Sequence, residues 1–334
     1  MKLGLIVGHM NAPGGAKIIE LAQETEALGY DTIWCAEIYG TDCFTPLTWI
    51  GAHTSRINLG TSIMQISART PASAAMQAVS LDHLSNGRLI LGIGVSGPQV
   101  VEGWYGQPYP KPLARTREWV QIFRKIVSRQ EPVVFEGDHY QLPYPGGTGL
   151  GKPLRLMMHP VRDHIPLYLG AEGPKNVALG AELFEGWIPM FISPYRMREQ
   201  YKAALQNMAP DFEITAAVPV VINDDLDSAL AQVKQQVGFY VGGMGAKSYN
   251  VHKDHVSRMG FEAEANKIQE LFLAGKRDEA IAAVPDQLVD EISLCGPRGR
   301  IQERLMAWKE SPITMLNVNS SDTEAVRFLA EELL

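Results

Sequence analysis

The sequence has few cysteines and lacks long apolar or basic runs. None of its three cysteines, Cys35, Cys43 and Cys295, stands in a Cys-x-x-Cys pair, which excludes the usual spacing of zinc sites and disulfide frameworks. Cysteines without a pairing pattern are typical of proteins in a reducing cytoplasm, and we expect this location. No stretch of about 18 apolar residues occurs, so we expect no membrane span. The first residues run straight into an apolar segment, and we expect no signal peptide.

The charge pattern argues against nucleic acid as a partner. The formal net charge is −7, and the basic residues form no cluster along the chain. The histidines are scattered, so we predict no metal site. His252 and His255 are interpreted as part of a mobile loop rather than as a ligand pair.

The composition supports a large core and an alternating αβ architecture. The chain has 334 residues, of which 46% are hydrophobic, enough for one αβ barrel or two smaller domains. The predicted strands are Lys2–Gly8, Thr32–Ala36, Ile57–Met64, Leu89–Ile93, Pro166–Gly170, Gly186–Phe191, Glu213–Ile222 and Ile313–Val318. The predicted helices are Ala16–Leu28, Thr45–Thr54, Pro71–Leu84, Leu113–Val127, Pro174–Leu183, Tyr195–Met208, Leu226–Tyr240, Phe261–Ala274, Arg277–Ala283, Asp286–Leu294, Pro297–Glu310 and Thr323–Leu333.

Eight short apolar strands alternating with helices predict a parallel sheet with helical crossovers. Eight such units favour a single (β/α)8 TIM barrel over residues 1–334. A doubly wound open sheet is the alternative. Two irregular segments, 130–164 and 242–285, are interpreted as insertions on the barrel, the first with a hairpin over Pro132–Tyr140.

The glycine-rich stretch after the fourth strand is the strongest candidate for a binding loop. Gly92, Gly94 and Gly97 fit the dinucleotide pattern G-x-G-x-x-G, but no acidic residue ends the next strand, as ribose binding needs. We therefore disfavour a Rossmann fold; a turn required only for packing remains an alternative. Ser96 to Pro98 read as a helix start, whose free N–H groups favour an anionic ligand.

Polar residues follow the predicted strands at their carboxyl ends, where a barrel places its site. These residues are His9, Glu37, Gln65, Ser96, Glu172, Ser193, Asn223 and Asn319.

Four motifs together resemble the luciferase-like flavin and deazaflavin oxidoreductases, and more narrowly the branch that uses the deazaflavin coenzyme F420. They are Leu59–Ile63 with Arg69–Pro71, Leu81–Arg88, Leu91–Gly106 with Lys111–Thr116, and Leu169–Asn176. The resemblance covers nearly the whole chain. It implies a luciferase-like TIM barrel that binds F420, with FMN as the alternative cofactor.

The resemblance also implies which residues hold the coenzyme. Ser62 and Ile63 stand where the family has a non-proline cis peptide behind the ring, and Glu37 and Gln65 stand where polar groups reach the ring's edge. The two loops on the phosphate side match Ser96, Gly97, Pro98 and Gln99, and Ala171, Glu172, Gly173 and Pro174. Relatives that oxidise sugar phosphates have a histidine after the acidic residue, whereas Ile38 stands here.

A proton donor is needed when a carbonyl or alkene is reduced. We favour His9, at the end of the first strand, with Tyr105, Glu102 and Glu37 as further candidates. Structural roles remain open for His9 and Glu102. A hydrophobic substrate wall is expected from Met10, Trp49, Trp104, Tyr105, Phe191 and Tyr195.

The resulting expectation is an F420-dependent oxidoreductase that moves a hydride to or from a small carbonyl, alcohol or activated alkene. Two alternatives remain: an FMN-dependent luciferase-like monooxygenase, and a barrel that binds the coenzyme without turnover. The resemblance implies a homodimer. The sequence does not specify the substrate or the direction of the reaction.

Overall fold

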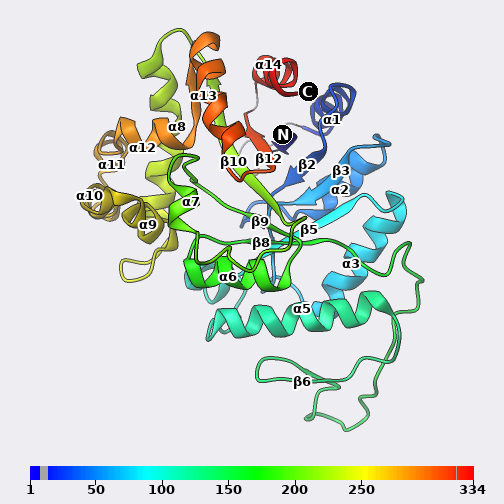
Figure 1. The fold of residues 1–334 in the computed structure, drawn as a ribbon. Coiled ribbons are helices and arrows are strands. Elements are labelled where there is room, and N and C mark those ends of the chain that lie inside the picture. The colour runs from blue at the N-terminus through cyan, green and yellow to red at the C-terminus, as the bar shows by residue number, and fades with distance from the viewer. Residues whose placement is uncertain (8–13, 321) are drawn as a thin grey trace.

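The computed structural model describes residues 1–7, 14–320 and 322–334. Within them, eight parallel strands close into a barrel that helices surround (Figure 1). The barrel strands are β1 (Lys2–Val7), β2 (Thr32–Cys35), β3 (Asn58–Thr61), β5 (Leu89–Gly94), β8 (Leu167–Gly170), β9 (Gly186–Ile188), β10 (Glu213–Ile222) and β12 (Met315–Asn319). Glu213 and Ile214 pair with Gly186 and Trp187 and close the ring. The predicted TIM barrel is confirmed, and the open-sheet and Rossmann alternatives are wrong.

The third barrel strand is interrupted near its carboxyl end. β3 stops at Thr61, the peptide bond between Ser62 and Ile63 is cis, and β4 (Met64–Gln65) then pairs with the end of β5. The sequence predicted one strand over Ile57–Met64. The interruption brings Ser62 and Ile63 to the barrel mouth.

A short strand that the sequence did not predict extends the sheet. β11 (Leu294–Gly296) pairs with the end of β10, from Val220 to Ile222. The helix predicted over Asp286–Leu294 therefore ends earlier, at Ile292.

Helices follow most barrel strands at the predicted places. Those of the described chain are α1 (Gly15–Ala27), α2 (Phe44–Gly51), α3 (Pro71–Leu84), α4 (Pro98–Val101), α5 (Pro112–Ser128), α6 (Pro174–Leu183), α7 (Met197–Gln200), α8 (Leu226–Gly243), α9 (Val251–Val256), α10 (Glu262–Leu273), α11 (Arg277–Ala282), α12 (Asp286–Ile292), α13 (Arg298–Glu310) and α14 (Thr323–Leu333), and a π-helical turn, η1 (Ser257–Phe261), joins α9 to α10. The long helix predicted over Tyr195–Met208 is wrong: only α7 forms there, and turns follow it. None of the described helices has the length and apolar character needed to span a membrane.

The core has three parts. Trp34, Ile90, Tyr168, Ile188 and Met315 fill the barrel, and a large cluster lies between the strands and their helices. A third cluster joins α8 to helices α9 to α12. Most of segment 242–285 is therefore helical, whereas segment 130–164 contains only the hairpin β6 (Phe135–Glu136) and β7 (Gln141–Leu142) among its regular elements.

Candidate functional site

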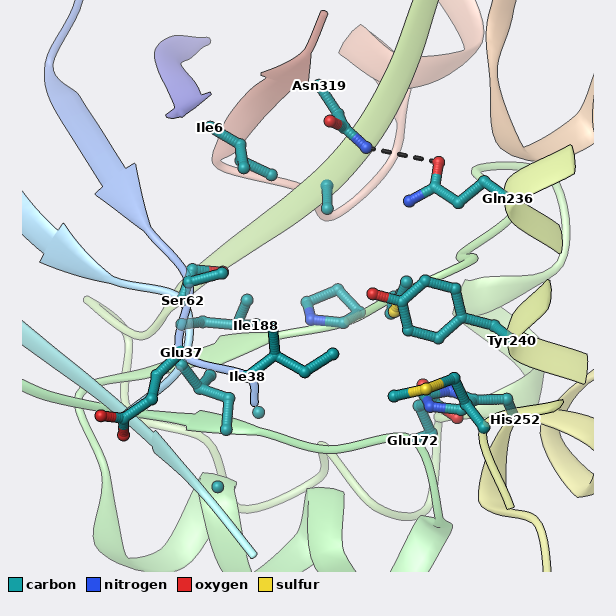
Figure 2. A pocket seen from close by; sticks show the side chains of 18 of the residues that line it. Ile6, Glu37, Ile38, Ser62, Glu172, Ile188, Gln236, Tyr240, His252 and Asn319 are labelled. Carbon is teal, nitrogen blue, oxygen red and sulfur yellow. Dashed lines mark hydrogen bonds and ion pairs between the residues drawn. The ribbon is translucent and has the colours of Figure 1, made fainter. Parts of the chain in front are cut away.

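A cavity of about 1770 Å³ opens at the carboxyl ends of the barrel strands. Its wall includes residues that follow β2, β3, β5, β8 and β9, together with side chains of α8 and α9. Figure 2 shows Ser62 and Glu37 on one side of this space. His252 and Tyr240 lie on the opposite side. The position matches the place where TIM barrels carry their active sites.

Ile63 forms part of the cavity wall and lies between two glycines. A Cβ on Gly94 would come within 2.5 Å of Ile63 Cδ1, and a Cβ on Gly170 within 2.8 Å of Ile63 Cγ2. A side chain at either position would therefore displace Ile63 from its place in the wall. All three residues line the cavity, and they give it a smooth apolar face.

Glu37 is buried and fully engaged. Its Oε1 accepts a hydrogen bond from Arg69 Nη2 at 2.5 Å, and its Oε2 accepts from Arg69 Nη1 at 2.9 Å and from the backbone N–H of Gln65 at 2.8 Å. Burial alone would lower the pKa of Arg69, but hydrogen bonding and attraction to Glu37 raise it. A carboxylate held in this way is suited to positioning Gln65.

Gln65 carries an unsatisfied acceptor. Its side chain is buried, and its Nε2 donates to the carbonyl of Glu37 at 3.2 Å. Its Oε1 has no hydrogen-bond partner in the described part of the chain. An unpaired buried oxygen is costly, so its presence in a cavity wall indicates a ligand N–H or a water.

The loop after β5 lines the cavity as predicted, with one exception. Ser96, Gly97 and Gln99 are lining residues, whereas Pro98 is not among them. Ser96 adopts a left-handed conformation with φ of 59°, and its carbonyl accepts a hydrogen bond from Tyr109 Oη at 3.1 Å. These features fix the loop at the barrel mouth.

The loop after β8 brings all four predicted residues, Ala171 to Pro174, to the cavity. Glu172 Oε1 lies 2.6 Å from His252 Nδ1, and its Oε2 is buried without a partner in the described ranges. Burial favours the neutral acid, but His252 and, more weakly, His255 and Arg258 outweigh it, and the pKa of Glu172 falls below its usual value. Glu172 is therefore a buried carboxylate paired with an imidazole.

Of the four predicted proton donors, Glu37 lines the cavity and two others do not. His9 lies outside the described residues. Glu102 is exposed at the end of α4, and neither it nor Tyr105 is among the lining residues. Burial raises the pKa of Tyr105, with a smaller contribution from Glu37.

The predicted substrate wall does not form where the structure describes its residues. Trp49, Trp104, Tyr105, Phe191 and Tyr195 are not among the lining residues, and Met10 lies outside the described part. Trp49, Trp104 and Tyr195 are exposed at the surface, whereas Phe191 belongs to the core around α8. The apolar side chains that line the cavity include those of Ile38, Ile188, Met190, Phe239, Tyr240, Met244 and Tyr249.

His252 is the functional candidate that the sequence interpretation missed. It is the second residue of α9, and it lines the cavity. The signal that could have found it is Asn250, whose side chain accepts hydrogen bonds from the backbone N–H groups of His252 and Lys253. An asparagine before such a segment is a helix start signal, and it argues against a mobile loop.

Comparison with known proteins identifies the family. The sequence model of the luciferase-like monooxygenases matches residues 3–315. The chain belongs to this family. A Mycobacterium tuberculosis protein, provisionally named a coenzyme F420-dependent oxidoreductase, is 47% identical over 341 residues, which cover 99% of this chain and 98% of that protein. The predicted family is confirmed.

Two solved structures share the barrel fold. The coenzyme F420-dependent tetrahydromethanopterin reductase of Methanopyrus kandleri superposes with a TM-score of 0.77 at 22% identity, covering 99% of this chain and 97% of the other. An F420-dependent secondary alcohol dehydrogenase, solved with an F420-acetone adduct, has a TM-score of 0.78 at 16% identity and covers 99% and 98%. At these identities the similarity establishes the fold.

Proposed function

We propose that this protein is a coenzyme F420-dependent oxidoreductase that transfers a hydride between the deazaflavin and a small organic substrate, a carbonyl, an alcohol or an activated alkene. The observation that carries the proposal is a relative that is named an F420-dependent oxidoreductase and that matches 99% of the chain at 47% identity. The cavity at the barrel mouth has the chemistry that this coenzyme requires.

The residues of the cavity fit a flat ring with one polar edge. Ile63, between Gly94 and Gly170, offers an apolar face without protruding side chains beside it. The unpartnered Oε1 of Gln65 is an acceptor for a ring N–H. The phosphate of the coenzyme would lie at the loops after β5 and β8, where Lys175 supplies a positive charge in the cavity wall.

The protein's own contribution is binding, orientation and proton transfer, because the coenzyme supplies the hydride chemistry when bound. Arg69 holds Glu37, and Glu37 in turn holds the backbone of Gln65. The apolar side chains of Ile38, Ile188 and Phe239 exclude water from the substrate's part of the cavity. Ile38 stands where sugar-phosphate relatives have histidine, so we propose an uncharged substrate.

The test is a fluorescence titration of the purified protein with F420 and, separately, with FMN. We expect saturable F420 binding and weaker FMN binding. We expect the reduced coenzyme to be consumed with at least one member of a panel of ketones, aldehydes and cyclohexenone. Tighter binding of FMN, with turnover that requires oxygen, would favour the monooxygenase alternative. Tight F420 binding without reduction of any probe would favour a binding protein.

A substitution locates the coenzyme within the cavity. Gln65→Met keeps the length of the side chain and removes the acceptor, so F420 affinity should fall about 2- to 10-fold, the value of one hydrogen bond. Gln302→Met, on the exposed surface of α13, is the matched control and should leave affinity unchanged. Equal affinities for the two variants would place the ring's polar edge elsewhere. We also propose that the protein is a homodimer, which analytical ultracentrifugation tests, and that it is cytoplasmic.

A further inference from the structure

The cavity holds a carboxylate–imidazole pair on the side facing away from Ser62 and Glu37. His252 comes from α9 and Glu172 from the loop after β8, and the two lie on the same side of the pocket in Figure 2. His252 Nδ1 lies 2.6 Å from Glu172 Oε1, and its side chain is 16% exposed. No described residue is hydrogen-bonded to its Nε2.

We propose that His252 is the proton-transfer residue of the reaction and that Glu172 is its positioning residue. This inference rests on the proposed function and extends it, because it assigns the acid–base role to a side chain outside the loops that follow β1, β2 and β5. With Nδ1–H directed at Glu172, Nε2 is the nitrogen that can exchange a proton with a substrate oxygen.

The imidazole is held in place from several sides. The ring of Tyr240 lies edge-on at 5.0 Å between centroids and 89° between planes, and Phe191 lies at 6.3 Å. Asn250 ties the first turn of α9 to α8, since its Nδ2 donates to the carbonyl of Val241 at 2.8 Å. Such constraints reduce the reorganisation that accompanies proton transfer.

Glu172 is fixed independently of its contact with His252. Its carbonyl accepts a hydrogen bond from Tyr201 Oη at 2.8 Å, and Tyr201 Oη also lies 3.2 Å from His255 Nδ1. His255, three residues after His252 on α9, has its Nε2 3.1 Å from the carbonyl of Phe191. This network connects α9 to the loop after β8, so both members of the pair are anchored to the same frame.

The proton transfer balances with the hydride that the proposed reaction requires. In reduction of a ketone, the carbonyl carbon receives the hydride from the reduced coenzyme, the π pair of C=O moves to oxygen, and protonated Nε2 gives its proton to that oxygen. The alcohol is formed, solvent reprotonates the imidazole, and the proton that the coenzyme's ring N–H loses on oxidation passes to solvent, so that protons balance. Oxidation of the alcohol is the reverse. The carboxylate of Glu172 stabilises the imidazolium form.

The pair can be detected by NMR without coenzyme or substrate. In protein labelled with ¹⁵N-histidine, we expect a downfield Nδ1–H proton that exchanges slowly with water. It should disappear in His252→Gln and move upfield in Glu172→Gln, since a neutral amide oxygen is a weaker acceptor. The control is His164→Gln, which removes a histidine from the exposed pair with Glu185 and should keep the signal. If the wild-type protein lacks this downfield Nδ1–H signal, the inference is overturned.

Kinetics test the role of the pair. With a ketone or enone that the wild-type enzyme reduces, His252→Gln should lower kcat about 10²- to 10⁴-fold while F420 affinity stays within about twofold. Glu172→Gln should lower kcat less and shift the pH–rate profile toward lower pH, because the carboxylate no longer favours the imidazolium. The charged or titratable groups that also face the pair are His255, Arg258, Tyr201 and Tyr240.

The two failures are distinguishable. Wild-type protein that does not bind F420 contradicts the proposed function. Turnover in His252→Gln at the wild-type rate contradicts this inference and leaves the proposed function standing. If His252→Gln loses both coenzyme binding and turnover, the inference is contradicted as well, because a structural role of His252 would then explain the lost turnover. His164→Gln is expected to keep wild-type kcat.

Discussion

Trp34 fills the barrel interior because two neighbouring strand residues have no side chain. A Cβ on Gly60 would come within 2.2 Å of Trp34 Cε3, and a Cβ on Gly4 within 2.7 Å of Trp34 Nε1. The indole is fully buried. In interiors packed as densely as crystals, one added methyl group forces side chains or backbone to shift. These glycines are therefore packing requirements, in contrast to Gly94 and Gly170 at the cavity.

Gly60→Ala should lower the free energy of unfolding by about 1–3 kcal/mol, since overpacking strains the barrel around Trp34. Urea unfolding followed by tryptophan fluorescence measures it. Gly299→Ala is the matched control: no atom lies within 4 Å of the added Cβ on α13, so it should leave stability unchanged or raise it by up to about 1 kcal/mol. Equal stability of the two variants would contradict the packing role of Gly60.

At the scale of the elements, the eight barrel strands were predictable because each is a short apolar run bounded by turn residues. The failures have physical causes. Beyond Tyr201, the segment predicted as helix has only Ala204 and Leu205 partly packed on the core, too little apolar surface to hold a regular helix. β11 is three residues long, and the helix predicted over Asp286–Leu294 includes only its first residue.

The site residues that belong to a local sequence motif were predictable, whereas contacts between residues far apart in the sequence were not. Gln65 and the loops after β5 and β8 reach the cavity as the resemblance implied, with the exception of Pro98. The Glu172–His252 contact joins residues 80 positions apart, and no sequence spacing encodes it. Local patterns specify elements, whereas such contacts follow from how the elements pack.

Glu291 connects α12 to the segment after β9, and this connection should depend on pH. Arg196 donates to both of its oxygens, at 2.5 and 2.7 Å, and Ser193 Oγ lies 3.1 Å away. Burial would raise the pKa of Glu291, but the bonds from Arg196 and its neighbours lower it. A depressed pKa contributes stability above the unfolded-state pKa, near 4.3, and loses it as pH falls through the folded-state value.

Glu291→Gln should therefore lower the free energy of unfolding by about 1–2 kcal/mol at pH 7, and the difference from wild type should shrink as pH falls below about 4. Urea titrations across pH measure it. The exposed pair Arg298–Glu324 supplies the control, because Glu324→Gln should change stability by less than about 1 kcal/mol at any pH. A pH-independent difference for Glu291→Gln would refute the argument.

Considered as a whole, the barrel has one end that opens into the cavity and an opposite end, and at each end an arginine holds a buried carboxylate. Arg69 holds Glu37 at the cavity, where the Glu37 side chain is 3% exposed. Arg162, near the end of segment 130–164, holds Asp82, 2% exposed, beside the start of β5, and also donates to the carbonyl of Leu89. The motif Leu81–Arg88 that helped to identify the family therefore stabilises the end away from the cavity.

These two pairs allow stability and coenzyme binding to be separated. Arg69→Met and Arg162→Met each leave a buried carboxylate unpaired, so both should lower the free energy of unfolding by about 3–5 kcal/mol. F420 affinity should fall only in Arg69→Met, since Glu37 then loses the partner that fixes it against Gln65, whereas Asp82 lies at the opposite end. Urea unfolding and fluorescence titration at a temperature where both variants are folded measure the two effects. Weaker binding in Arg162→Met would mean that the ends of the barrel are coupled, because loss of the Asp82 pair would then act on the cavity through β5, the strand that begins beside Asp82 and ends at Gly94.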